Sequence, residues 1–306
     1  MMMALKMQAP EDYDLLASVH AWIFPDVQPV PEMTNSDSTW RVFAVADKQV
    51  PMRITQVTSG EELRVHWGSV RIPESVIMNK VRRVLSLDQD MASAHADMQN
   101  NQEICHLVDR VKGIRPYLAD TAFEALIKTI IQQQISYRAA NVITRRLILG
   151  LGKKQDWYET TYSFPSAEDI ASVGTDTLKQ YGLGYKAEYI DNLCAMIVRG
   201  DIIIDDLKNM NYNEAREVLH PIKGIGEWTI EVFAIAGLGD FSIFPFGDLG
   251  IQNLLGRLFS LGRRMKKSEV EKVSARWGKT GPMILYLLMC ADVLGYMGQI
   301  GRSGNP

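Results

Sequence analysis

The 306-residue sequence has few cysteines and no long apolar segment. Its three cysteines lie far apart, at Cys105, Cys194 and Cys290, which excludes a disulfide framework and a closed four-cysteine metal or iron–sulfur site. No apolar run approaches the ~20 residues needed to cross a bilayer, so no membrane partner is expected. Residues 1–10 contain no basic cluster followed by an apolar stretch, so no signal peptide is expected.

The sequence also lacks a histidine cluster and an excess of positive charge. Its five histidines form no i, i+4 pair and have no cysteine partner, so no side-chain metal site is predicted. Lys and Arg number 33 against 36 Asp and Glu, which gives a net charge of −3. A general nucleic-acid binder usually has a basic total, so this balance argues against one. Local basic clusters are nevertheless present, at Lys80/Arg82/Arg83, Arg138/Arg145/Arg146 and Arg263/Arg264/Lys266/Lys267.

Hydrophobic periodicity divides the chain at about residue 76. Residues 40–46, 50–58 and 63–67 are rich in β-branched and aromatic side chains or alternate with period two, which predicts short antiparallel strands. Further along, the period becomes helical and remains so. With 46% hydrophobic residues, the chain can bury a large core. We therefore predict an α+β protein with a small antiparallel β-rich domain, residues 1–76, and a larger all-α domain, residues 77–306.

Capping signals define the ends of several predicted helices. Gly150-Leu151-Gly152 predicts a left-handed end to the second helix, and Gly200 predicts the end of the third. Asn213 is expected to cap the fourth helix, and Ser268 is expected to open a capping box. The predicted helices span residues 121–133, 137–149, 185–199, 213–219, 227–236, 268–277 and 282–295.

The segment with the most chemical information is residues 219–229, LHPIKGIGEWT. A short amphipathic helix is followed by a turn containing Gly224 and Gly226, and a second helix starts at once. Glycines at these positions allow positive φ and leave no Cβ in the way of a close approach. The free N–H groups and the dipole at the start of the second helix then suit a phosphate. An ordinary αα-hairpin has the same local pattern, so the turn alone assigns no function.

Four motifs in order give the sequence a family resemblance. They are residues 122–126 leading to 133–136, residues 181–183 leading to 186–187, the hairpin at 222–229, and FPFGDL at 244–249 with Pro245 and Asp248. Any one motif alone would be weak evidence, whereas four in the right order and spacing are specific. With these motifs the sequence resembles the helix-hairpin-helix (HhH-GPD) DNA glycosylase superfamily, and within it the 3-methyladenine DNA glycosylase II (AlkA-like) branch.

The resemblance covers residues 113–295 strongly and the β-rich part more loosely. It implies that the helical domain comprises two subdomains flanking a cleft for DNA and the excised base. It also implies that the partner is damaged double-stranded DNA and that the protein is a monomer with no obligate protein partner. The expected location is the cytoplasm, with the nucleoid, in a prokaryote and the nucleus in a eukaryote.

By the resemblance, Asp248 is the catalytic carboxylate. Hydrolysis of an N-glycosidic bond passes through an oxocarbenium-like sugar, and a nearby anion stabilises its positive charge or orients the attacking water. Asp248 also opens a predicted helix, and aspartate is a common helix cap. The two roles do not exclude each other, because a helix N-terminus favours an ionised carboxylate. Gly247 leaves room for a sugar-phosphate to approach.

Trp228 indicates the subclass of glycosylase. Bifunctional members of the superfamily have a lysine here that forms a Schiff base with the sugar, so tryptophan implies no lyase activity. The indole is also a stacking platform for a flipped, positively charged alkylpurine, although a core anchor is the other interpretation. The resemblance assigns further pocket walls to Val232, Met289 and Tyr286, residue types that at helical spacing usually belong to a core. The arginine that relatives often have at the start of the last helix is Gly281 here, which leaves the breadth of the substrate range open.

The resemblance also implies which residues contact the DNA. Gln134, beside Gln133, would wedge into the duplex where the damaged base has left, which offsets part of the cost of flipping. A solvated polar loop is the alternative interpretation of these glutamines. Lys223, Gly224, Ile225 and Gly226 would contact the DNA backbone. No cofactor is implied, apart from a structural Na⁺ or K⁺ on the carbonyl oxygens of His220, Ile222 and Ile225.

The sequence therefore predicts a monofunctional DNA glycosylase that starts base excision repair. It would flip alkylated purines of the 3-methyladenine and 7-methylguanine type out of double-stranded DNA and excise them by hydrolysis. The first alternative is a non-catalytic helix-hairpin-helix DNA-binding protein, which needs the hairpin but no carboxylate. The second is a glycosylase for oxidised or mismatched bases, which the missing lysine and the missing cysteine cluster disfavour.

Overall fold

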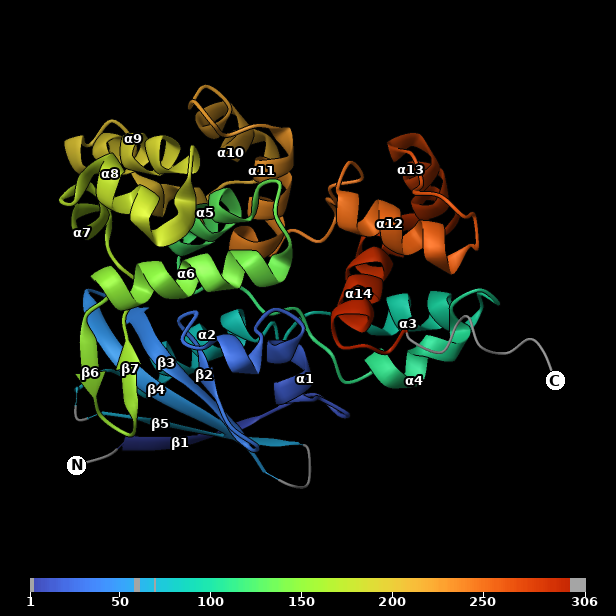
Figure 1. Ribbon diagram of the computed structural model, residues 1–306. Helices are drawn as coiled ribbons and strands as arrows, with labels where there is room; N and C mark the ends of the chain where they lie inside the picture. The colour runs from blue at the N-terminus through green and yellow to red at the C-terminus, as the bar shows by residue number, and fades with distance from the viewer. Residues whose placement is uncertain (1–2, 58–60, 69, 298–306) are drawn as a thin grey trace.

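The computed structural model describes residues 3–57, 61–68 and 70–297, and it confirms the predicted α+β class (Figure 1). Five antiparallel strands form one sheet in the order β1-β5-β4-β3-β2. A separate two-stranded hairpin, β6-β7, lies farther along the chain. The strands are β1 (Met3–Gln8), β2 (Met33–Thr34), β3 (Ser38–Val45), β4 (Lys48–Gln56), β5 (Glu62–Trp67), β6 (Lys154–Asp156) and β7 (Thr160–Tyr162).

Fourteen α-helices make up most of the rest of the described chain, and none of them is long and apolar enough to span a membrane. Helix α11 continues directly into a π-helical turn, residues 234–238. The helices are α1 (Leu15–His20), α2 (Glu74–Val84), α3 (Ala92–Gln99), α4 (Val108–Val111), α5 (Ala122–Gln132), α6 (Tyr137–Leu151), α7 (Ala167–Ala171), α8 (Gly174–Leu178), α9 (Lys186–Arg199), α10 (Tyr212–Leu219), α11 (Glu227–Phe233), α12 (Leu249–Leu258), α13 (Lys267–Arg276) and α14 (Gly281–Val293).

The sheet follows from the period-two pattern of its strands. In β5, Leu63, Val65 and Trp67 are fully buried, whereas the intervening Arg64 is exposed. The three predicted strands correspond to β3, β4 and β5. Periodicity did not indicate β1, which pairs with β5 along its whole length, nor the short edge strand β2. Antiparallel pairing of this kind places alternate side chains on one face, which here is covered by α1 and α2.

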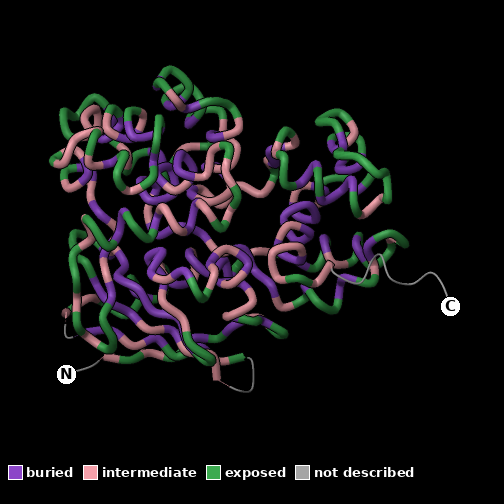
Figure 2. Tube along the Cα trace, viewed as in Figure 1, coloured by how far each residue is buried: buried purple, intermediate pink, exposed green. Residues whose placement is uncertain are grey.

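The buried apolar residues form three separate cores (Figure 2). The sheet core includes residues of α1 and α2. The first helical body, α5–α11, has its own core around Leu126, Ile190 and Phe233. The second helical body is built from α3, α4 and α12–α14, with Ile251 and Leu285 at its centre. The second body combines residues 91–114 with residues 244–291, so the first body is inserted between its two segments in the sequence.

Several predicted boundaries are wrong for local reasons. Residues Gly150 and Leu151 lie inside α6, and Gly152 has a φ of −71°, so α6 does not end in the left-handed conformation. The prediction for Gly200 is confirmed, because this residue ends α9 in the left-handed conformation. Gly150 is small for packing instead, because a Cβ there would lie 2.4 Å from the Tyr181 hydroxyl oxygen. The cap of α10 is Asn211 rather than Asn213. Helix α13 begins at Lys267, and its N-cap is Lys266 instead of Ser268. The backbone N–H of Lys266 donates to the Glu269 side chain (2.7 Å).

Two differences concern the domain description. The hairpin β6-β7 lies within the stretch predicted to be entirely helical, and β7 contacts β3 of the large sheet. A three-residue strand is too short for its alternation to stand out from helical periodicity. The predicted boundary at residue 76 falls inside α2, whose Ile77 and Val81 pack in the sheet core.

A buried cluster of charges joins the sheet to the first helical body. Arg41 of β3 donates through Nη1 to Glu32 Oε1 (2.5 Å) and through Nη2 to Glu124 Oε2 of α5 (2.5 Å). All three side chains are at most 1% exposed. Asp120 extends the cluster, since its Oδ2 accepts the Ala44 N–H (2.6 Å) and its Oδ1 lies 2.6 Å from Lys80 Nζ. These contacts hold α5 at a defined position on the sheet.

Replacing Arg41 with methionine should destabilise the protein strongly. The variant leaves the Glu32 and Glu124 carboxylates buried without their guanidinium, which typically costs about 3–5 kcal/mol of unfolding free energy. Urea unfolding measures the loss. Arg257→Met is the matched control, because its pair with Asp292 (2.8 Å) is exposed and should contribute at most about 1 kcal/mol. Equal losses in the two variants would contradict this account of α5.

Candidate active site

The predicted hairpin forms between α10 and α11, and its first glycine is required for two reasons. Gly224 has a φ of +90°, and a Cβ there would lie 2.3 Å from Cγ of Tyr189. Gly226 is the N-cap of α11, and an added Cβ would meet none of the described residues within 4 Å. Lys223 is exposed, with its Nζ 6.0 Å from the centre of the Tyr189 ring. The turn is therefore closely packed against Tyr189 at Gly224 and open at Gly226.

The two predicted wedge residues differ in their surroundings. Gln133 donates through Nε2 to the Gly224 carbonyl (2.8 Å) and to Thr229 Oγ1 (2.9 Å), so it ties the α5–α6 loop to the hairpin. Gln134 is exposed at the tip of the same loop, with a left-handed φ of +57°. Its Oε1 accepts from the Tyr185 hydroxyl (3.2 Å). Of the pair, Gln134 is the exposed residue, and its wedge role stays a prediction.

Asp248 performs the predicted capping role and has a further contact. Its Oδ1 accepts the N–H groups of Gly250 (2.7 Å) and Ile251 (3.1 Å) at the start of α12. Its Oδ2 accepts the indole N–H of Trp228 from α11 (2.8 Å). Three donors from two helices thus fix the carboxylate, and none of them is a cation. The three donors are neutral, so none of them forms an ion pair with the carboxylate, an arrangement suited to the electrostatic stabilisation of a developing positive charge.

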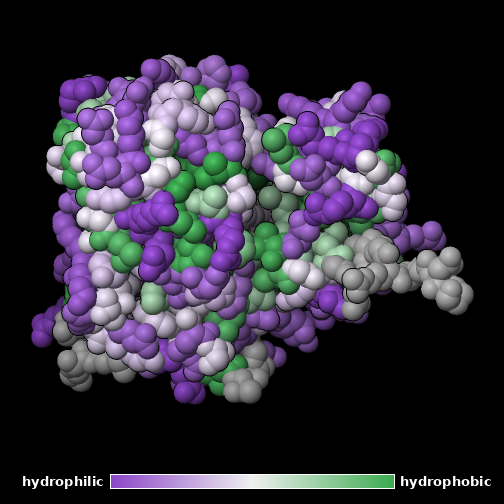
Figure 3. Space-filling model, in the orientation of Figure 1, coloured by the Kyte–Doolittle hydropathy of each residue, from purple (hydrophilic) through white to green (hydrophobic). Residues whose placement is uncertain are grey.

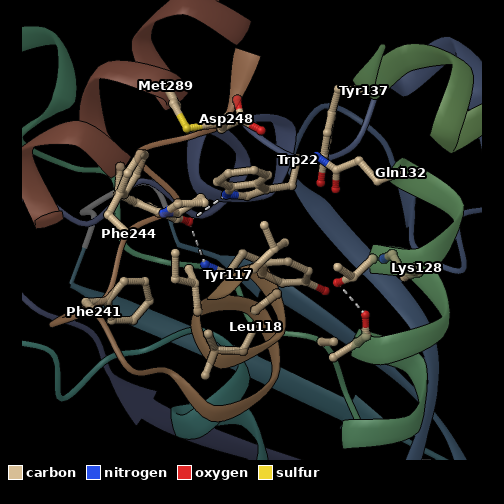
Figure 4. A pocket seen from close by; sticks show the side chains of 18 of the residues that line it. Trp22, Tyr117, Leu118, Lys128, Gln132, Tyr137, Phe241, Phe244, Asp248 and Met289 are labelled. Atoms are coloured by element: carbon tan, nitrogen blue, oxygen red, sulfur yellow. Dashed lines mark hydrogen bonds between the residues drawn. The ribbon is translucent and has the colours of Figure 1, made fainter. Parts of the chain in front are cut away.

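Asp248 stands at the mouth of a cavity that is partly open to solvent (Figure 4). Of the predicted pocket residues, Val232, Tyr286 and Met289 line this cavity. Trp228 does not line it, because its indole points to Asp248 and borders the groove outside. Trp228 thus lines the groove and not the cavity, and its stacking role stays a prediction. Six aromatic side chains line the cavity together with aliphatic ones, and they are those of Trp22, Tyr117, Tyr137, Phe241, Phe244 and Tyr286.

Trp22 is the main candidate site residue that the sequence analysis did not indicate. It follows α1 in the N-terminal part, yet its indole N–H donates to the Tyr286 hydroxyl of α14 (2.6 Å). The centre of its ring lies 5.2 Å from that of Tyr286 and 5.3 Å from that of Tyr137. Burial keeps the pKa of the Tyr286 hydroxyl well above its usual value, so this wall remains neutral. No local motif marks Trp22, and only the tertiary contact identifies it.

A groove leads from the cavity across the molecule. Residues from both helical bodies line it, among them Gln133, Gln134 and Trp228 from the first body and Gly247 and Met289 from the second. In Figure 3 the surface is hollowed between the two bodies, and hydrophobic side chains border the hollow. Trp22, Gln132, Tyr137, Asp248 and Met289 line both the cavity and the groove and so mark the opening between them.

The groove contains an acid with an unusual proton affinity. Burial raises the pKa of Glu231 to about 7, with Lys267 opposing the rise and Glu227 and Glu271 adding to it. Lys267 belongs to one of the predicted basic clusters and lines the groove. Arg263 of the same cluster pairs with Glu269 (2.7 Å) and does not line the groove. Among the described residues that line the groove, Lys267 is the one Lys or Arg, and its Nζ lies 3.9 Å from Glu271 Oε1.

Metal-binding groups are sparse in the described ranges, 3–57, 61–68 and 70–297. They contain no group of three or more His, Cys, Asp or Glu side chains that would hold a metal ion. Of the hairpin carbonyls implied as ligands for a monovalent cation, that of Ile222 accepts the Ile225 N–H (3.0 Å). A carbonyl oxygen has a second lone pair, so the hairpin remains compatible with such an ion.

A helix-hairpin-helix fold with a fixed carboxylate at the mouth of an aromatic cavity defines a class of DNA repair protein that works on single bases. Residues 127–280, half of the chain, match the HhH-GPD superfamily of base excision DNA repair proteins, and the chain belongs to this superfamily.

Relatives agree with the predicted 3-methyladenine glycosylase (AlkA-like) branch. A DNA-3-methyladenine glycosylase of Bacillus subtilis is 25% identical over 88% of this chain and 90% of its own. The structure of a 3-methyladenine DNA-glycosylase from Archaeoglobus fulgidus matches with a TM-score of 0.84 and 25% identity, covering 94% of this chain and 98% of the other. The fold alone is shared with a Clostridium acetobutylicum 8-oxoguanine glycosylase/lyase in complex with double-stranded DNA (TM-score 0.73, 18% identity, 96% and 98% covered).

Trp228→Phe should slow base excision without weakening DNA binding. Phenylalanine keeps a ring in the groove but removes the N–H that orients Asp248 Oδ2. Loss of one charge-assisted hydrogen bond corresponds to roughly tenfold or more in rate. Single-turnover excision and DNA affinity, measured on the same damaged duplex, separate the two effects. A normal rate with reduced affinity would instead support the stacking role that the sequence suggested for Trp228.

DNA affinity should decrease as the pH rises from 6 to 8. Because the pKa of Glu231 is about 7, its carboxyl group becomes ionised over this range and adds negative charge to the groove, which opposes binding of an anionic duplex. Fluorescence anisotropy across this range measures the dependence, and Glu231→Gln should abolish it. An identical pH dependence in the glutamine variant would assign the effect to another group.

Proposed function

We propose that the protein is a monofunctional DNA glycosylase that removes alkylated purines, of the 3-methyladenine and 7-methylguanine type, from double-stranded DNA. The observation that carries this proposal is the Asp248 carboxylate, fixed by three hydrogen bonds where an aromatic cavity opens into a groove. A purine flipped into the cavity would bring its sugar to that opening. The reaction would start base excision repair.

The cavity suits an electron-poor base. Alkylation at a ring nitrogen makes a purine in DNA positively charged and weakens its glycosidic bond. Aromatic faces attract such a cation by about 0.5–2 kcal/mol. The walls formed by Trp22, Phe241 and Phe244 provide these faces, and Phe241 packs edge-on against Tyr286 with ring centres 5.3 Å apart. The substrate is held by stacking and shape, so the cavity needs few polar contacts.

Asp248 acts on the sugar in this mechanism. As the bond between C1′ and the base nitrogen breaks, its electron pair leaves with the base and positive charge develops on the sugar. The carboxylate stabilises that charge, and water adds to C1′ while its proton passes to solvent or to the carboxylate. The bonds from Gly250, Ile251 and Trp228 keep the charge in place, so no reorganisation is needed during the reaction.

DNA contacts come from the hairpin and the neighbouring loop. Backbone N–H groups at the Gly224–Gly226 turn would bind a phosphate, with Lys223 beside them on the exposed side. Gln134 would fill the space left by the flipped base. A Na⁺ or K⁺ on the carbonyls of His220, Ile222 and Ile225 would brace the turn, and no other cofactor is proposed.

The absence of lyase activity follows from the residue at position 228. A Schiff base needs a lysine amine at the sugar, and this position is tryptophan with its N–H bound to Asp248. We further propose a monomer, acting in the cytoplasm with the nucleoid in a prokaryote or in the nucleus in a eukaryote.

Two alternatives are less well supported by the site. A non-catalytic helix-hairpin-helix protein would need the hairpin, but not a carboxylate and an aromatic cavity behind it. A glycosylase for oxidised or mismatched bases shares the fold, as the Clostridium structure illustrates. The fold therefore does not separate these two functions, and identification of the released base does.

Asp248→Asn should abolish base release while DNA binding remains. The amide keeps the size and the capping oxygen but loses the charge, and removal of such an electrostatic contribution slows the rate by about 10²–10³-fold. The experiment incubates methylated duplex DNA with each protein, identifies released bases by mass spectrometry and examines the strand on a denaturing gel. Wild type should release 3-methyladenine or 7-methylguanine and leave the strand intact. Retained binding without release by wild type would favour the non-catalytic alternative, and strand cleavage would contradict the absence of lyase activity.

A further inference from the structure

The cavity has one polar side, and it belongs to α5 and α6. Figure 4 shows Lys128, Gln132 and Tyr137 on this side, facing Phe241, Phe244 and Leu118 across the cavity. Lys128 and Gln132 are four residues apart on α5, so they lie one above the other on the same helix face. The proposed mechanism uses neither of them.

Most other polar groups of the cavity wall are already engaged. The Thr129 hydroxyl donates to the Ala125 carbonyl (2.8 Å). The Tyr286 hydroxyl accepts from the Trp22 indole (2.6 Å) and from the Tyr117 N–H (3.3 Å). The Tyr117 hydroxyl in turn lies 3.2 Å from Glu32 Oε1. A base in the cavity therefore finds its polar partners on the α5–α6 side.

Lys128 retains donors for such a partner. Its ammonium has three N–H groups, and one is donated to the Val30 carbonyl (3.1 Å). The nearest carboxylate oxygens belong to Glu124 (3.5 Å) and Glu32 (3.9 Å), which is beyond the roughly 2.7–2.9 Å of a charge-assisted hydrogen bond. The side chain is 26% exposed and lines the cavity. A ligand atom in the cavity can thus accept a hydrogen bond from it.

The charge of Lys128 is balanced by the buried cluster beneath it. Arg41, Lys80 and Lys128 face three carboxylates, those of Glu32, Asp120 and Glu124. Three positive and three negative charges leave the cluster neutral. Lys128 therefore presents a directed hydrogen-bond donor without a net field that would repel a positively charged base.

Lys128 lies in the interior of the cavity rather than at its opening. Asp248 and Gln132 line both the cavity and the groove, whereas Lys128 lines the cavity alone. A purine whose sugar is at Asp248 would direct its far edge, which bears the group at C6, into this interior. A lysine has donors and no acceptor, so it pairs with a carbonyl oxygen and not with an amino group.

We propose that Lys128 is a specificity-determining residue that selects 6-oxopurines over 6-aminopurines among alkylated bases. The inference rests on the proposed function and names the substrate class within it. A 6-oxo lesion such as 7-methylguanine accepts a hydrogen bond from the ammonium. A 6-amino lesion such as 3-methyladenine leaves that donor unpaired in a desolvated site, and sites built to bind a polar group discriminate strongly against analogues that lack it.

The test compares two lesions released from one methylated duplex. Both bases are alkylated and positively charged in DNA. They differ at C6, and also at C2 and in the methylated nitrogen, so the ratio of the two is compared between variants, in which these other differences stay constant. Rates of 7-methylguanine and 3-methyladenine release are measured by mass spectrometry, each corrected for uncatalysed loss. In Lys128→Met the ratio of 7-methylguanine to 3-methyladenine release should fall about tenfold relative to wild type. Lys128→Arg keeps the donors and should preserve most of the ratio.

Lys80→Met is the matched control for the loss of a cation from the buried cluster. Lys80 pairs with Asp120 (2.6 Å) but does not line the cavity, so its replacement should leave the ratio unchanged. If Lys128→Met is unfolded by circular dichroism, Lys128→Gln takes its place, since an amide also accepts from an amino group and should lower the ratio.

The outcomes separate this inference from the proposed function. An unchanged ratio in the folded Lys128 variant, or an equal fall in Lys80→Met, overturns the role of Lys128 while release of both bases by wild type upholds the glycosylase. If wild type releases neither base, the proposed function fails, and the selection of lesions fails with it.

Discussion

The buried contact between Arg41 and the carboxylates of Glu32 and Glu124 is the constraint on which the site depends. It links α5 to the sheet through side chains that are almost fully buried. An unpaired charge in such a site would be costly, so the three partners are held in one arrangement. Helix α5 carries Lys128 into the cavity and ends at the loop of Gln133. Through Gln133 the same helix is bonded to the hairpin. One ionic cluster thus sets the position of the cavity wall and of the hairpin turn that we propose contacts DNA.

The second organising contact is the hydrogen bond from Trp228 to Asp248. It joins α11, the helix after the hairpin, to the start of α12 in the second body. The part that would bind a phosphate is thereby held in a fixed position relative to the part that would stabilise the sugar. The net charge of −3 is compatible with DNA binding for this reason, because the proposed contacts use backbone N–H groups and helix ends. Few free cations are needed, and few of them line the groove.

Much of the fold was predictable because its signals are local. The alternation in β5 and the apolar stripe of α5 are set by which side chains must be buried, and both elements formed as expected. The errors occurred where a neighbour in space overrides the local signal. Gly150 resembles a helix end but is small because Tyr181 packs on it, and β6-β7 is too short to show a period. Strand β1 was missed although it pairs with β5 along its whole length.

The sequence by itself determined the hairpin with its obligatory Gly224, the aspartate that opens α12, and the family to which both belong. These features depend on backbone conformation and helix capping, which involve residues close together in the chain. Only the tertiary structure decided what surrounds Asp248. In the folded protein the Trp228 indole donates a hydrogen bond to the Asp248 carboxylate. Trp22 contacts Tyr286, which lies 264 residues away in the sequence. A cavity is made by side chains from distant segments, and no local pattern specifies which of them will meet.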